Sequence, residues 1–145
     1  MRYLSLLLLL LGFVNCDSSK ESVPEPSEWE QAKALWQRQA IQNYTITQQI
    51  VCYCIESYTR PRTLEVQNGQ LFTVNGETYN PDHHPEAYSI DAFFELLEQN
   101  LGREPHQTTL VFDETYGYTT HAYFDFEEMI ADEEIGFYFT GFQPE

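Results

Sequence analysis

Two of the three cysteines, Cys52 and Cys54, are the residues whose spacing most directly indicates chemistry. Residues two apart on an extended strand place their side chains on one face, with Cα atoms about 6.5 Å apart. That separation is at the upper end of disulfide geometry, so a bridge would require a local bend. We predict a structural disulfide, because thiols that can pair outside the cytoplasm generally do so. Two buried free thiols, or a redox or metal-binding pair, are the alternatives.

Histidines and acidic residues offer further metal-ligand types, but their spacing matches no known site. The adjacent His83 and His84 could join Cys52 and Cys54 around a metal ion, yet the two pairs are not spaced as in zinc motifs. The acidic runs within 125–128 and 132–134 lack the alternating ligands and the turn glycine of a calcium loop. We therefore assign no metal site and no cofactor.

Catalytic machinery has no signature in this chain. Acids and four histidines are present, but abundance alone does not define an acid–base pair. His121 falls on the polar side of an alternating segment, which favours a solvated histidine. No serine or threonine lies in a glycine-flanked nucleophile turn. We name no catalytic residue and favour a non-enzymatic role, with an enzyme of unrecognised type left open.

The third cysteine, Cys16, ends a segment that has the order of an export signal. Arg2 provides the positive end, and residues 4–14 form an apolar run that is too short to span a hydrocarbon core. Residues 17–28 are rich in Ser, Glu and Pro, a composition typical of an unfolded tether. A cysteine between signal and tether is where bacterial lipoproteins carry their acyl chains.

We predict that residues 1–15 are removed as a signal peptide and that Cys16 is lipidated, with palmitate-type chains. Residues 16–27 would then be a flexible tether, and the domain would be anchored in the bacterial cell envelope, facing the extracytoplasmic space. Each buried methylene of an acyl chain contributes about 0.8 kcal/mol to such anchoring. An ordinary cleaved signal with an incidental cysteine is the alternative, because Phe13 and Asn15 depart from the usual lipobox.

The charge of the chain excludes one class of partner. Loss of residues 1–15 would leave six Lys and Arg against 23 Asp and Glu, a net charge of −17. Such a surface repels phosphate backbones and anionic lipid head groups, so nucleic-acid binding is excluded. A cationic partner, a divalent ion or simple solubility is compatible with this charge.

Periodicity predicts the elements that must position these residues. A helix over 28–42 begins with a capping box formed by Ser27 and Glu30, and Ser89 caps a second helix that ends near Leu101. Residues 79–88 contain two prolines and are expected to form a loop. Strands are expected at 44–55, with both cysteines pointing inward, and at 63–67, 70–74, 108–113, 118–126 and 135–142.

Short links between these strands require antiparallel neighbours, and Asn68-Gly69 is the strongest hairpin signal. The expected fold class is therefore α+β, in the order α-β-β-β-α-β-β-β. One antiparallel sheet of about six strands would carry two helices packed on one face, within a single globular domain over 28–145.

Several segments together resemble a bacterial family of secreted and lipoprotein domains of unknown function, family 6174. The resemblance would cover roughly residues 28–143, and Thr119 stands where the family usually has proline. It implies export and fold, but no activity and no site residues. The segments are Trp36, Tyr44-Thr45-Ile46, Cys52-Tyr53-Cys54, Val66-Gln67-Asn68-Gly69-Gln70-Leu71, Ser89-Ile90-Asp91-Ala92-Phe93-Phe94, Phe112-Asp113-Glu114-Thr115-Tyr116-Gly117-Tyr118-Thr119 and Asp132-Glu133-Glu134-Ile135-Gly136-Phe137.

These observations predict an uncharacterised cell-envelope lipoprotein that acts as a binding or interaction domain. Its membrane attachment would be the lipid on Cys16. A protein or ligand would bind the sheet face or the aromatic turn around Tyr116, Tyr118 and Tyr123. The alternative function is thiol–disulfide or metal handling through Cys52 and Cys54.

Overall fold

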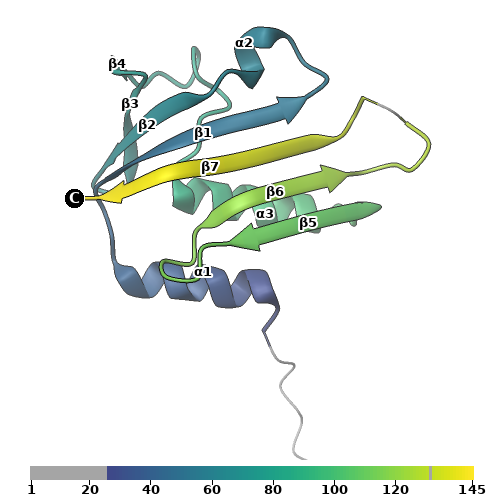
Figure 1. Ribbon diagram of the computed structural model, residues 1–145, viewed down its shortest axis with the longest axis horizontal. Helices are drawn as coiled ribbons and strands as arrows, with labels where there is room; N and C mark the ends of the chain where they lie inside the picture. Colours follow the sequence, from purple (N-terminus) through teal and green to yellow (C-terminus); the bar gives the residue numbers. More distant parts are fainter. Residues whose placement is uncertain (1–25, 131) are drawn as a thin grey trace, which may run out of the picture.

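The computed structural model describes residues 26–130 and 132–145 as an antiparallel sheet with helices on one face (Figure 1). The predicted signal peptide, Cys16 and nearly all of the predicted tether lie outside these residues. None of the helices in the described ranges is long and apolar enough to cross a membrane.

The sheet has seven strands, all paired antiparallel, in the spatial order β4-β3-β2-β1-β7-β6-β5. The predicted α+β class and single antiparallel sheet are confirmed. The additional strand is β4, which has two residues and forms a short edge after the Asn75-Gly76 turn. The strands are β1 (Tyr44–Cys52), β2 (Arg62–Gln67), β3 (Gln70–Val74), β4 (Glu77–Thr78), β5 (Gln107–Phe112), β6 (Thr119–Asp125) and β7 (Ile135–Pro144).

Within the described residues, three helices accompany the sheet. The helix α1 (Glu28–Gln39) begins with the expected capping box, in which Glu30 accepts hydrogen bonds from both the backbone and the side chain of Ser27. It ends earlier than predicted, because Ala40 takes a left-handed conformation. The helix α3 (Ile90–Leu101) has Ser89 as its side-chain cap, as predicted. The short helix α2 (Glu56–Thr59) was not predicted and follows the segment 44–55 that was expected to be one strand.

An aromatic core fills the space between the sheet and the two longer helices. Phe93 of α3 lies with its ring centroid 4.6 Å from that of Phe139 and 5.0 Å from that of Phe137. Trp36 of α1 packs edge-on to Tyr44 and donates a hydrogen bond to Asp91 of α3. This ring packing fixes α1 and α3 on one side of the sheet and leaves the other side to solvent (Figure 1).

Buried polar groups join the 79–88 loop and the start of α3 to β1. Gln48 is fully buried, donates to the Glu86 carbonyl at 2.8 Å and accepts from the Tyr88 amide at 3.1 Å. The Tyr44 hydroxyl accepts from the Ile90 amide at 2.8 Å, and burial raises the pKa of this phenol. The loop has no helix or strand, as predicted, but these hydrogen bonds hold it against the sheet.

Candidate functional site

The two faces of the sheet differ sharply in what covers them. Along β1, buried positions that face the core alternate with positions on the open face, and this alternation continues through exposed Val51. The same alternation in β6 and β7 places His121, Tyr123 and Tyr138 on the open face. Side chains on this face are available to a ligand or partner.

A gap in the open face lies at Gly136, near the start of β7. The strand register places Val51 of β1 opposite Gly136 on one side and Tyr123 of β6 opposite it on the other. Because Gly136 has no side chain, the space between Val51 and Tyr123 is left unfilled. A glycine inside a strand often marks a place where a ligand or another backbone approaches closely.

Side chains around Gly136 turn this gap into a pocket of about 310 Å³. The rings of His121 and Tyr138 stack at one end, with centroids 4.3 Å apart and planes 13° apart. Glu134 contributes its carboxylate to the lining. A volume near 300 Å³ is at the lower end of those that hold small ligands. We call this site, lined by Val51, Cys52, Tyr53, His121, Tyr123, Glu134, Gly136 and Tyr138, the open-face pocket.

The electrostatic environment of the open-face pocket is negative. Partial desolvation raises the pKa of the Tyr123 phenol, and the carboxylates of Asp125 and Glu134 raise it further. Asp125 also keeps one side-chain oxygen, Oδ1, buried without a hydrogen-bond partner among the described residues. No lysine or arginine lines the pocket. The pocket therefore combines aromatic side chains with the Glu134 carboxylate, which accepts a hydrogen bond from the Asp132 amide at 3.2 Å.

Cys52 and Cys54 form a disulfide at the rim of this pocket, with Cα atoms 5.2 Å apart. The chain bends after Cys52, as the spacing argument required, so the strand predicted to reach residue 55 ends there. The expectation that both cysteines point inward is wrong for Cys54. Cys52 packs partly against the core, whereas Cys54 is exposed because the bend carries it beyond the sheet.

Exposed apolar side chains continue from the bend beside the pocket. Tyr53 is 82% exposed and Ile55 is 68% exposed, although both belong to types that are usually buried. Tyr53 lines the open-face pocket, so an aromatic ring is available at its edge. Contiguous exposed apolar groups of this kind are typical of binding sites.

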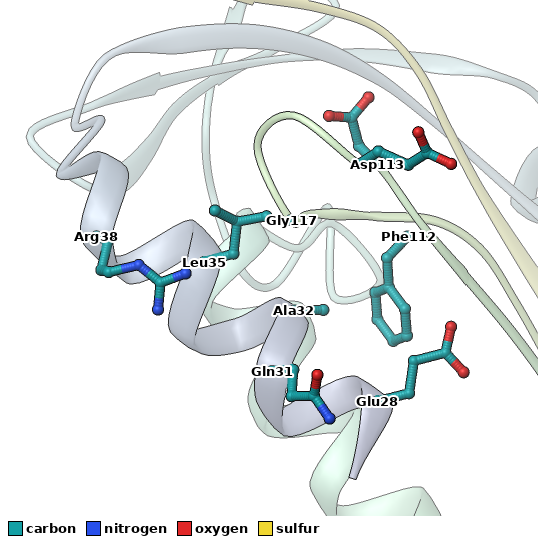
Figure 2. Close-up of a pocket in the computed structure, with 9 residues that line it drawn as sticks. Glu28, Gln31, Ala32, Leu35, Arg38, Phe112, Asp113 and Gly117 are labelled. Atoms are coloured by element: carbon teal, nitrogen blue, oxygen red, sulfur yellow. The ribbon is translucent and has the colours of Figure 1, made fainter. Parts of the chain in front are cut away.

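The turn over residues 113–118, which is part of the family resemblance, has a structural role. The Asp113 carboxylate accepts hydrogen bonds from the amides of Thr115 at 2.9 Å and Tyr116 at 2.7 Å, which closes the turn. Figure 2 shows Gly117 of this turn against α1, above Leu35. A hollow of about 340 Å³ lies between the turn and the helix, lined on the turn side by Phe112, Asp113, Glu114 and Gly117.

Two of the three aromatic residues predicted to form a binding surface around this turn pack against β7. Tyr116 and Tyr118 pack with ring centroids 5.0 and 4.9 Å from that of Phe142, and Tyr118 is buried. Burial also raises the pKa of the Tyr118 phenol. Tyr116 and Tyr123 are both half-buried, and Tyr123 lies on β6, on the open face and away from the turn.

The candidate metal ligands are not brought together. His83 is exposed in the 79–88 loop, and His84 stacks on Tyr79 with centroids 6.4 Å apart. Within residues 26–130 and 132–145, no three His, Cys, Asp or Glu side chains are grouped as a metal site would require. The sulfur atoms of Cys52 and Cys54 are bonded to each other in this state.

The disulfide and the position of His121 on the polar side of its strand were predictable from the sequence, whereas Gly136, Tyr138 and Glu134 were not predicted as site residues. The available signal was the glycine itself, which interrupts an alternating strand of large side chains. The importance of Gly136 depends on Val51 of β1 and Tyr123 of β6, which the strand register places opposite it. These two residues are far from each other in the sequence.

No curated protein and no solved structure shows a significant similarity to this chain. A family model does match it, with the description "Family of unknown function (DUF6174)", over residues 28–144. The match includes both the Cys52–Cys54 bend and the Asp113–Tyr118 turn. Because it spans nearly all of the described residues, the chain belongs to this family of unknown function.

Proposed function

We propose that this protein is a cell-envelope lipoprotein, anchored through Cys16, whose folded domain binds a ligand or partner in the open-face pocket. The observation that carries the proposal is the gap at Gly136, enclosed by Val51, Tyr123 and the His121–Tyr138 stack. An apolar and aromatic hollow with few polar groups is the usual form of a ligand site. The sheet supplies a rigid floor for it.

Binding can be located by nuclear magnetic resonance. The purified chain carrying Cys16→Ser would be labelled with ¹⁵N and titrated with small neutral, anionic and cationic aromatic or aliphatic fragments. We expect amide shifts at Val51, Tyr123 and Gly136, and their loss in Gly136→Val. A Cβ at residue 136 would meet its nearest atom, the Val51 Cβ, at 3.7 Å, so this variant should fold. Shifts elsewhere only, or unchanged shifts in the variant, would contradict the proposed site.

Anchoring is tested separately through Cys16. The wild-type chain should fractionate with the membrane and carry acyl chains on its N-terminal cysteine, measured by mass spectrometry. Cys16→Ser should release the domain into the extracytoplasmic space or stall processing of the signal. An unmodified N-terminus in a membrane-free wild-type protein would disprove lipidation without affecting the binding proposal.

Thiol–disulfide exchange is the second candidate function, and the exposure of Cys54 favours it. In that reaction a partner thiolate attacks one sulfur of the Cys52–Cys54 bond, and a second partner thiol releases the mixed disulfide. The partner dithiol is oxidised as the pair is reduced. Incubation with a reduced dithiol peptide, followed by mass spectrometry, separates the two functions. Rapid stoichiometric transfer would favour exchange, whereas a persistent Cys52–Cys54 bond favours a structural disulfide.

A further inference from the structure

We propose that the open-face pocket selects the cationic head of an organic amine or guanidine, an inference that rests on the binding function proposed above. Glu134 lines the pocket together with the aromatic rings of Tyr123 and Tyr138, and one face of the Tyr138 ring is stacked on His121. A cation held over such faces is attracted by the ring quadrupole, most strongly where water is partly excluded. Aromatic side chains and a carboxylate together suit an organic cation that also has an apolar part.

Charge in and around the pocket has one sign. Its lining contains a carboxylate and no lysine or arginine. The ion pairs found within the described residues are Lys33–Glu98 and Arg60–Glu56, which lie on or directly after helices. Glu134 therefore has no cationic partner among these residues. Since the whole chain carries a net charge of −16, an approaching anion would be repelled and a cation attracted.

The shape of the pocket indicates how the cation would lie. Gly136 forms the floor, so an apolar group can rest against the backbone of β7 between Val51 and Tyr123. The positive group would then lie between the Tyr138 ring of β7 and the carboxylate of Glu134, which directly precedes this strand. A cation–π contact already occurs elsewhere in this fold, where the Arg103 guanidinium lies 3.6 Å from the centroid of the Phe126 ring.

Matched probes that differ only in charge test this selection. Choline would be compared with 3,3-dimethyl-1-butanol, its neutral carbon isostere, and capped arginine with capped citrulline, by calorimetry on the Cys16→Ser chain. We expect each cation to bind roughly tenfold more tightly than its neutral partner, as a cation–π contact and one carboxylate would provide. If capped arginine binds more tightly than choline, the cation comes from a side chain of a protein partner. If choline binds more tightly than capped arginine, the cation comes from a small molecule.

Two variants connect the preference to the pocket. Glu134→Gln should reduce the preference for the cation severalfold and leave binding of the neutral isostere unchanged, whereas Gly136→Val should abolish binding of both. Equal affinity for choline and its isostere, or a preference that survives Glu134→Gln, would overturn the inference. If neutral fragments still bind at Gly136, the binding function stands without cation selection. If no probe or fragment binds at Gly136, both the binding function and the cation selection are contradicted.

Discussion

Gly117 and Gly136 are both glycines within the matched family region, yet the structure uses them in opposite ways. A Cβ on Gly117 would collide with the Ala32 carbonyl oxygen and lie 2.8 Å from the Trp36 amide nitrogen. A Cβ on Gly136 would make only ordinary contacts, the nearest at 3.7 Å. One glycine is required for close packing, and the other leaves space that the fold does not need.

The surroundings of the two glycines follow the same division. At the Asp113–Tyr118 turn, polar groups are hydrogen-bonded and the aromatic rings pack into the core. At the open-face pocket, Tyr53 and Val51 remain exposed. At the turn, the Asp113 carboxylate and the Tyr118 ring are therefore used for structure, whereas the pocket leaves side chains available to a partner. Substitutions should cost stability in the first region and binding in the second.

The largest expected effect is that of Gly117→Ala. Its φ of +86° is unfavourable for alanine, and the new methyl group would displace α1 from the turn. We expect a loss of about 3 kcal/mol or more in the free energy of unfolding, measured by chemical denaturation.

Gly76→Ala is the matched control for that variant. It has a similar φ of +80° but no atom within 4 Å of the new Cβ, so only the backbone strain applies. This control should lose about 1 to 2 kcal/mol. Equal losses in the two variants would show that close packing of Gly117 on α1 contributes nothing.

The next effect concerns the disulfide, which borders the pocket. Replacing Cys52 and Cys54 together with alanine should lower the free energy of unfolding by about 1 to 2 kcal/mol, because a short constrained loop and a half-buried side chain are lost. Ligand binding should also weaken, since Tyr53 would no longer be held at the edge. Unchanged stability would mean that the bend is maintained without the bond, and reduced wild-type protein should reproduce the double variant.

A smaller loss is expected for Asp113→Ala. It removes the carboxylate that accepts from two backbone amides, and a lost cap of this kind costs about 1 kcal/mol. Asp113→Asn retains an acceptor oxygen and should recover most of that stability. If asparagine is as destabilising as alanine, the negative charge rather than the hydrogen bonds supports the turn. Neither variant should change ligand binding at the open-face pocket.

The smallest effect on stability is that of Gly136→Val. The added side chain points to the open face, and a β-branched residue suits a strand, so the free energy of unfolding should change by about 0.5 kcal/mol or less. Loss of binding without loss of stability would establish the contrast with Gly117. A large destabilisation would instead make Gly136 a second packing glycine and remove the argument for a pocket.

The fold was more predictable from the sequence than the site, for a physical reason. Local rules determine the Ser89 cap, the Asn68-Gly69 hairpin and the alternation of β1, and these predictions are confirmed. The end of β1 at Cys52 was not predictable from alternation, because the disulfide bends the chain there. The open-face pocket depends on the register among β1, β6 and β7. This register brings Val51 and Tyr123, which are far apart in the sequence, to either side of Gly136.

The two hydrogen bonds of buried Gln48 have a consequence for how the molecule opens. They attach residues 79–88, which lack helix and strand, to the central strand of the sheet. Irregular loops usually exchange their amide protons quickly through small local fluctuations. Here the Tyr88 amide is released only when β1 itself separates from its neighbours. That proton should therefore exchange with deuterium as slowly as those of β1, so that an irregular loop and the middle of a sheet form one cooperative unit.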